Sequence, residues 1–292
     1  MSLRGVFTAL VTPFNKDRSV DEAALRNLVD LQVKGGVSGL VPMGTTGESP
    51  TLDHEEHIRV IEVVVDQANG KLPIIAGTGS NSTQEAIEMT KYAAEIGVAA
   101  SLQVAPYYNK PTQDGFFKHF AAIAEAVDIP LIIYNIPSRT AKNIENETML
   151  RLAEIPSIKG VKESSGDMIQ VMDLILRRPD GFVVLSGDDN IGLAMMAMGG
   201  DGIVSVASNI VPEQMSEMVS TALDNEIEKA RAIHYQLLPL FQGLFIETNP
   251  IPIKASLALQ DKIGEVYRLP MCAMADENKK ILKKVLKDLQ LL

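Results

Sequence analysis

Residues 158–162 read IKGVK, a short stretch with β-branched Ile158 and Val161 that runs straight into the small polar residues ESSG at 163–166. β-Branched residues favour strands, and small polar residues favour the turns that end them. Seven other stretches share this layout, each bounded by Gly, Pro, Ser, Asn or Asp. The expected strands are 6–11, 39–43, 73–76, 100–105, 131–134, 158–162, 182–186 and 202–206. Such short apolar runs are typical of parallel strands buried on both faces.

Helix-like segments separate these strands. Two helix starts, Asp53 with Glu56 and Ser82 with Glu85, have the spacing of a capping box. Eight strand–helix repeats in about 220 residues predict an α/β fold, a (β/α)8 TIM barrel. A doubly wound sheet is the alternative, but the first strand runs into VTPF at 11–14 and no phosphate-binding G-x-G-x-x-G follows it.

The end of the chain continues with helical patterning after the eighth repeat. We therefore expect a catalytic barrel over residues 1–223 and a C-terminal helical extension over residues 224–292, which could serve as an oligomer contact. The extension contains NPIPIK at 249–254, whose prolines fix a bend before the next helix.

Charge and cysteine content narrow the class of protein. The chain has 292 residues and a formal net charge of −10, which disfavours nucleic acid and anionic membranes as partners. It has no apolar stretch of about 18 residues. The start, MSLR at 1–4, lacks a signal-peptide layout, and the single cysteine, Cys272, excludes an internal disulfide. We expect a cytoplasmic protein.

Lys162 ends the expected sixth strand, where the active site of a barrel gathers. A lysine desolvated at the inner end of a strand has a lowered pKa and can form a Schiff base with a carbonyl substrate. Tyr134, one strand away, offers a phenol that can carry protons to and from an imine. The ordinary alternatives are a solvated lysine and a tyrosine that only packs.

Other strand ends supply groups that bind carboxylates. Thr45 and Thr46 lie between glycines that expose backbone N–H groups, and Arg139 can hold a second carboxylate in bidentate fashion. A simple turn and a surface salt bridge are the ordinary alternatives. No P-loop lysine follows the glycines. His54 and His57 are more simply explained as a solvated helix face than as metal ligands, so we expect no metal site.

Four motifs in this order resemble the dihydrodipicolinate synthase family: GTTGE at 44–48, YYNKP at 107–111, YNIPSRT at 134–140 and GVKE at 160–163. The resemblance covers essentially the whole chain, including NPIPIK at 249–254. It implies a class I aldolase-like lyase in which a lysine imine condenses pyruvate with L-aspartate 4-semialdehyde. The imine is the electron sink in such a reaction, so the resemblance implies no cofactor.

The resemblance also implies residue roles. Lys162 would form the Schiff base, Tyr134 would be the general acid/base, and Thr45 with Tyr108 would complete its proton relay, Tyr108 coming from a neighbouring subunit. The implied substrate-binding residues are Thr46 and the backbone around Val204 for the pyruvate carboxylate, Gly187 beside the imine, and Arg139 for the semialdehyde carboxylate. A relay across subunits needs at least a dimer, and the resemblance favours a homotetramer built from two tight dimers.

Family members that respond to L-lysine bind it at a subunit interface. The matching residues here are Ser49, His54, His57, Asn81, Glu85 and Tyr107. Pro50 stands where a small alanine would be expected.

Three alternatives remain open at this point. N-acetylneuraminate lyase usually has Gly-Ser-Thr-Gly-Glu where this chain has GTTGE at 44–48, so that Thr45 stands in place of the serine, and it lacks the Tyr108-type relay. A keto-deoxy-sugar aldolase is the second alternative. The third, from a different class, is a catalytically silent barrel that binds a keto acid as a sensor; it would have lost Lys162, Tyr134 or Thr45, and all three are present.

Overall fold

Eight short parallel strands form the frame of the protein in a computed structural model that describes residues 3–292. Met1 and Ser2, at which the signal-peptide interpretation begins, lie outside the described residues. Every strand end falls within two residues of its expected position. The strands are β1 Gly5–Ala9, β2 Gly39–Val41, β3 Ile75–Gly77, β4 Ala100–Val104, β5 Leu131–Asn135, β6 Ile158–Glu163, β7 Val183–Ser186 and β8 Gly202–Ser205.

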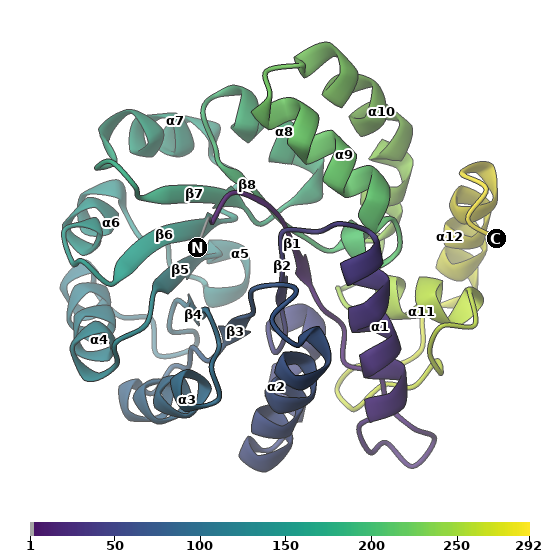
Figure 1. Ribbon diagram of the computed structural model, residues 1–292, viewed down its shortest axis with the longest axis horizontal. Coiled ribbons are helices and arrows are strands. Elements are labelled where there is room, and N and C mark those ends of the chain that lie inside the picture. Colours follow the sequence, from purple (N-terminus) through teal and green to yellow (C-terminus); the bar gives the residue numbers. More distant parts are fainter. Residues whose placement is uncertain (1–2) are drawn as a thin grey trace.

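Helices follow the strands and surround them (Figure 1). The α-helices are α1 Glu22–Lys34, α2 His54–Ala68, α3 Thr83–Glu95, α4 Gln113–Ala126, α5 Pro137–Thr140, α6 Asn146–Ala153, α7 Met168–Arg177, α8 Asp189–Ala197, α9 Pro212–Leu223, α10 Ile227–Gly243, α11 Ile251–Leu259 and α12 Asp276–Asp288. Three short 3-10 helices are η1 Thr45–Gly47, η2 Ser49–Thr51 and η3 Ala207–Asn209.

The sheet closes on itself. Its strand order is β2-β1-β8-β7-β6-β5-β4-β3, so the first and last strands of the chain are paired. A parallel bridge between Leu40 and Ile74 joins β2 to β3, and the Leu40 N–H donates to the Pro73 carbonyl at 3.0 Å. These links complete the ring and confirm the predicted (β/α)8 barrel.

The interior of the barrel is packed with side chains from alternate strand positions. Tyr134 belongs to this buried interior cluster. The other strand residues in it are Phe7, Ala9, Val41, Ile75, Ala100, Leu102, Ile132, Leu185 and Val204. The barrel is therefore a filled core with a reactive surface at one end, as its closed geometry requires.

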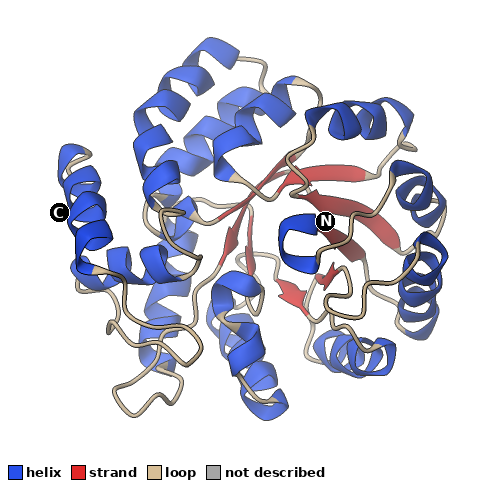
Figure 2. Ribbon diagram, turned by 180° about the vertical axis from the view of Figure 1, so that it is seen from behind, coloured by secondary structure: helices blue, strands red, loops and turns tan. Residues whose placement is uncertain are grey.

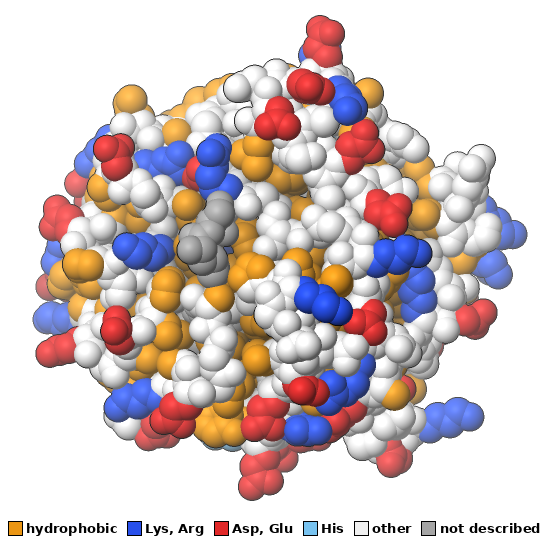
Figure 3. Space-filling model, in the orientation of Figure 1, with side chains coloured by type: hydrophobic (Ala, Val, Ile, Leu, Met, Phe, Trp, Pro, Cys, Tyr) orange, Lys and Arg blue, Asp and Glu red, His pale blue; other side chains and the backbone are white. Residues whose placement is uncertain are grey.

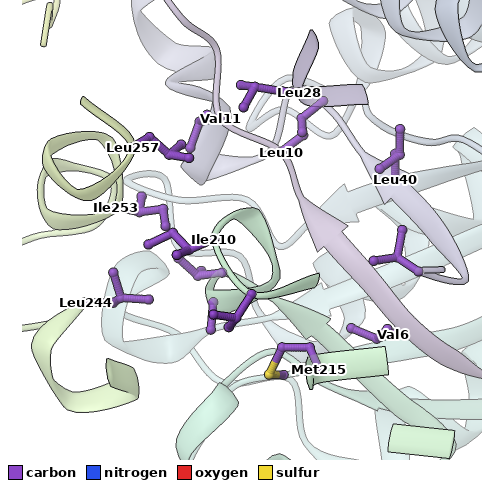
Figure 4. Close-up of a cluster of buried hydrophobic side chains, with 14 of the residues drawn as sticks. Val6, Leu10, Val11, Leu28, Leu40, Ile210, Met215, Leu244, Ile253 and Leu257 are labelled. Atoms are coloured by element: carbon purple, nitrogen blue, oxygen red, sulfur yellow. The ribbon is translucent and has the colours of Figure 1, made fainter. Parts of the chain in front are cut away.

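The helices after α9 pack onto the barrel. Helix α10 contacts α8 and α9, and α12 contacts both α10 and α11. Figure 4 shows Ile253 and Leu257 of α11 close to Val11 and Ile210, which follow β1 and β8. This shared apolar cluster joins the end of the chain to the strand ends on one side of the barrel.

The two ends of the barrel differ. Figure 3 shows the face drawn in Figure 1, where acidic and basic side chains are interspersed around the rim. Figure 2 gives the opposite face, where the short helix α5 lies across the centre of the ring of strands. Among residues 3–292, no helix combines the length and apolar character needed to cross a membrane.

Candidate active site

Tyr134 and Lys162 are register partners on the adjacent strands β5 and β6. Residues paired in register on neighbouring strands point to the same face of a sheet, which here is the barrel interior. Both side chains are buried, and the Lys162 Nζ lies 4.0 Å from the centroid of the Tyr134 ring. The structure therefore brings together the amine and the phenol predicted from the strand ends.

The surroundings of Lys162 favour the neutral amine. Burial lowers the pKa of the Lys162 ammonium to about 8, and Arg139 lowers it further, while the carboxyls of Asp188 and Asp189 oppose the shift. Desolvation penalises the charged form of any buried amine. A larger fraction of Lys162 is thus an unprotonated nucleophile near neutral pH than for a solvated lysine.

The pKa values of Tyr134 and Asp188 are raised, which favours their protonated forms. Burial raises the pKa of the Tyr134 phenol, and the Asp188 charge adds to this effect, while Arg139 opposes it. Burial also raises the pKa of Asp188, although Lys162 counteracts it. A phenol that keeps its proton at neutral pH is suited to donate it to a developing alkoxide or leaving hydroxyl.

Gly187 lies against the lysine. A Cβ placed on Gly187 would be 1.9 Å from the Ser164 Oγ and 2.9 Å from the Lys162 Cε. No side chain fits there without movement of the lysine, so the glycine allows the backbone after β7 to approach the amine. Val204, the other backbone position expected at the site, lies in β8 and is buried in the interior cluster.

Thr46 and Arg139 are connected through Asn249. The Asn249 side-chain amide donates to the Thr46 Oγ1 at 2.9 Å, and the Arg139 guanidinium donates to the Asn249 carbonyl at 3.3 Å. Thr46 is buried, whereas Arg139 is exposed on α5. Arg139 is therefore available to a charged group at the surface, whereas Thr46 is available only to a group that has entered the barrel.

A cavity of about 410 Å³ opens beside these residues. Thr45, Tyr134 and Arg139 line it, and they lie at the ends of β2 and β5. Five residues of the expected lysine site line the same cavity: Ser49, His54, His57, Glu85 and Tyr107. The two sets of residues thus share one continuous space.

Glu85 is one of the polar residues that line this cavity. Its carboxylate accepts a hydrogen bond from the Ser80 hydroxyl and lies 2.5 Å from the His54 Nε2. The capping box expected at Ser82 and Glu85 is therefore wrong in one half: Ser82 accepts from the Glu85 N–H at 3.4 Å, but the Glu85 carboxylate is directed to the cavity. The box at Asp53 and Glu56 is complete.

Hydrogen bonds also hold other residues of the expected lysine site in place. His57 donates from Nε2 to the Gly77 carbonyl at 2.7 Å, and burial lowers its pKa, which favours the neutral ring. The expectation of a wholly solvated histidine pair is therefore wrong for His57. Asn81 donates to the Tyr107 carbonyl at 3.2 Å. Within residues 3–292, no group of three His, Cys, Asp or Glu side chains is arranged to hold a metal ion.

Tyr108 is not brought to Tyr134 in the single chain. Its side chain is 91% exposed, with φ of +70°, and it does not line the cavity described above. In the single chain, Tyr108 is therefore separate from the residues that line the cavity.

Sequence reasoning missed three residues of the site. Asp188 and Ser164 lie against Lys162 and Gly187, and Asn249 links Thr46 to Arg139. Asp188 could have been suspected, because it follows the seventh strand by two residues, but nothing in the sequence distinguishes it from Asp189. The Asp189 carboxylate instead accepts from the Val206 and Ala207 N–H groups.

Comparisons with known proteins agree on one family. The sequence model described as the dihydrodipicolinate synthetase family matches residues 2–289. A protein named 4-hydroxy-tetrahydrodipicolinate synthase, from Koribacter versatilis, is 54% identical over 286 residues, covering 98% of this chain and 95% of that relative.

Solved structures give the same result. The dihydrodipicolinate synthase from Acinetobacter baumannii, described as chloride inhibited and complexed with pyruvate, has a TM-score of 0.98 and 43% identity, with full coverage of both chains. A structure from Cyanidioschyzon merolae with lysine bound has a TM-score of 0.96 and 40% identity, covering 99% of each chain.

Proposed function

The chain belongs to the dihydrodipicolinate synthetase family, and on this premise we propose how its residues condense pyruvate with L-aspartate 4-semialdehyde to give 4-hydroxy-tetrahydrodipicolinate. The enzyme is a lyase, and the reaction is the first committed step of diaminopimelate and lysine biosynthesis. The observation that carries the proposed chemistry is the buried Lys162 amine beside the Tyr134 phenol.

The first step joins pyruvate to the enzyme. The neutral Lys162 amine attacks the keto carbon of pyruvate, and the carbinolamine loses water to leave an imine. Tyr134 gives a proton to the departing hydroxyl and receives one back later. The raised pKa of its buried phenol supports this role, because the proton is present at neutral pH.

The second step forms the new carbon–carbon bond. Loss of a methyl proton turns the imine into an enamine, whose carbon attacks the aldehyde of the semialdehyde. The substrate's own amine then attacks the imine carbon, closes the ring and releases Lys162. The imine accepts an electron pair when the methyl proton leaves and again when the amine attacks. In between, the enamine gives the pair to the aldehyde carbon, and the aldehyde oxygen takes up a proton to become a hydroxyl.

Two separate places would bind the two substrates. Thr46 and the backbone around Val204 would hold the pyruvate carboxylate, with Gly187 beside the imine. Arg139 would bind the semialdehyde carboxylate at the entrance. The burial of Thr46 and the exposure of Arg139 support this order, since pyruvate must bind deepest.

Thr45 and Tyr108 would connect Tyr134 to solvent as a proton relay. Thr45 lines the cavity with Tyr134, whereas Tyr108 extends outward, which supports a relay completed by Tyr108 of a second copy of the chain. The active enzyme would then be at least a dimer.

An exposed apolar surface on helix α7 supports assembly into a tetramer. Ile169, Met172 and Leu176 lie on one side of α7 and are exposed, Ile169 to 77% and Leu176 to 83%. Exposed apolar side chains in a row on one helix are typical of an interface. We assign this α7 stripe, Ile169–Met172–Leu176, to the contact between two dimers.

L-Lysine would bind between Ser49, His54, His57, Asn81, Glu85 and Tyr107 as a feedback inhibitor. The Glu85 carboxylate suits an ammonium group, and hydrogen bonding from Ser80 lowers its pKa, so it is ionised. A related structure from Cyanidioschyzon merolae is described with lysine bound.

We also propose that the chain divides into a barrel over residues 1–223 and a helical extension over residues 224–292. A cytoplasmic location is supported by the unpaired Cys272.

The test is consumption of pyruvate with aspartate 4-semialdehyde as acceptor, run beside N-acetylmannosamine. Turnover with the semialdehyde alone is expected. Turnover with the sugar alone would contradict the acceptor role of Arg139 and support a sibling aldolase. No turnover with either would favour another acceptor or the silent keto-acid sensor.

A further inference from the structure

A buried ion pair joins the C-terminal helices to the loop that carries Thr45 and Thr46. Glu48 follows these threonines, and Lys254 lies on α11. The Lys254 Nζ is 2.5 Å from the Glu48 Oε1, and the two side chains are 0% and 1% exposed. Two charges removed so fully from water are costly, so their retention calls for an explanation beyond stability.

The surroundings of the pair are apolar on one side. The Lys254 Nζ lies 4.1 Å from the centroid of the Phe14 ring and 5.3 Å from that of Tyr267. The second Glu48 oxygen is 3.4 Å from the Arg268 backbone N–H. The carboxylate is thus held by two points of the C-terminal extension, and the ammonium has one carboxylate partner among these contacts.

Glu48 is the hinge point of its loop. It lies between η1 and η2 with φ of +55°, a left-handed conformation that non-glycine residues adopt only when the surroundings hold them there. Its N–H donates to the Thr45 carbonyl at 3.1 Å, and its carbonyl accepts from the Thr51 N–H at 2.9 Å. The orientation of Glu48 therefore sets the path of the chain on both sides.

Both sides of this hinge line the cavity. Thr45 lies before the hinge and Ser49 after it, and the same cavity is lined by Tyr134 and Glu85. Asn249, just before α11, independently holds Thr46. The Thr12 hydroxyl donates to the Gly47 carbonyl at 2.7 Å, and the ion pair adds a buried anchor on the side chain of the hinge residue itself.

We propose that Lys254 and Glu48 are positioning residues: their ion pair fixes the loop so that Thr45 and Thr46 face the Lys162 imine. The pair touches no substrate and acts through the threonines. This inference rests on the proposed function, because it presupposes that the two threonines serve the pyruvate half-reaction. It predicts that pyruvate chemistry depends on the pair, while binding of the semialdehyde at Arg139 does not.

The experiment removes both charges at once. Glu48→Gln/Lys254→Met keeps the approximate volume and leaves no unpaired buried charge, so the double variant should unfold near the wild-type temperature. A loop displaced by about 1 Å costs roughly 10²-fold in rate. We expect kcat and the rate of borohydride-trapped pyruvate adduct formation to fall by that order, with KM for the semialdehyde unchanged.

The matched control is the ion pair of Arg178 and Asp201, which lies at the start of β8, at the opposite end of the barrel, and is also largely shielded. Asp201→Asn/Arg178→Met should change thermal stability and leave kcat as in the wild type. Wild-type kcat and adduct formation in the Glu48→Gln/Lys254→Met variant would overturn the proposal. An equal fall in the control variant would overturn it too, since the effect would then follow from stability.

A third variant provides a test if the Glu48→Gln/Lys254→Met variant does not fold. Glu48→Asp keeps the charge pair but shortens its reach by one methylene, so it should fold and still lose kcat; wild-type kcat in Glu48→Asp would contradict the proposal. The wild type separates the two claims. If it forms no pyruvate adduct, the proposed function fails; if it forms one and the variants match it, only the positioning role fails.

Discussion

Lys162 is the residue on which the chemistry depends, and its burial has a measurable consequence. Only the neutral amine attacks pyruvate, and burial lowers the pKa of the ammonium to about 8. The rate of imine formation should rise about tenfold per pH unit below 8 and level off above it. Trapping the adduct with borohydride from pH 6 to 9 measures this; a rate that still climbs steeply at pH 9 would contradict it.

The same shift predicts a pH-dependent stability difference. Between about pH 8 and 10.5 the unfolded chain holds a proton on Lys162 that the folded chain lacks, so the free energy of unfolding rises with pH across this range. Below pH 8 the buried ammonium costs roughly 3 kcal/mol. Lys162→Met should therefore be more stable than the wild type at pH 7 and lose that advantage by pH 10.5. Chemical denaturation of both proteins tests this, and a constant difference would contradict it.

Tyr134 offers a second test at the same scale. Tyr134→Phe keeps the ring in the barrel interior but removes the proton, so turnover should fall by roughly 10²–10⁴ while the melting temperature stays close to that of the wild type. Steady-state kcat and a thermal melt give both numbers. A kcat near the wild-type value would remove Tyr134 from the acid/base role.

Residue identity was partly predictable from the sequence. Lys162 and Tyr134 follow from their positions at strand ends, because a barrel gathers its strand ends at one face. The roles of Asp188 and Asn249 do not follow from the sequence. The position of the Asp188 side chain depends on the turn after β7, and Asn249 lies more than 100 residues from Tyr134 along the chain, so local patterns do not place either residue in the site.

At the scale of elements, the sequence locates the limits of the strands closely, but it does not locate the buried face of helix α2. Each strand is short, apolar and bounded by turn residues, so its limits are visible in the sequence. Helix α2 has a wide apolar side, and its buried residues include Val60, Val63 and Val64. A spacing of three and four residues groups Ile58 and Val65 with Ile61 and Ala68, yet Ile58 and Val65 are only half-buried. When the apolar side of a helix is this wide, spacing alone does not locate the centre of the buried face.

The turn after β7 gives the test at this scale. In Gly187→Ala the new methyl meets the Ser164 hydroxyl and the Lys162 Cε, so the lysine must move. Pyruvate adduct formation should fall by roughly 10²-fold. Adding Ser164→Ala removes the nearer obstacle and should restore part of the rate, with Ser164→Ala alone as the control. A wild-type rate in Gly187→Ala would show that the backbone does not confine the amine.

The whole molecule is predicted to be a symmetric assembly. Glutamates at Ile169 and Leu176 would place charges in the proposed dimer–dimer contact, so Ile169→Glu/Leu176→Glu should sediment as a dimer while the wild type sediments as a tetramer. Ile281→Glu, a comparable change at an exposed residue of α12, should not alter the assembly. An unchanged mass in the double variant would place the contact elsewhere. No sequence pattern gives this surface, because apolar spacing on a helix does not say whether its own chain or another covers it.

The most direct measurement is to incubate wild type and Lys162→Ala with pyruvate, reduce with borohydride, and locate the adduct by peptide mass spectrometry. We expect one reduced pyruvate on the peptide containing Lys162 in the wild type and no adduct in Lys162→Ala. An adduct that survives in Lys162→Ala, or one on another lysine of the wild type, would contradict it.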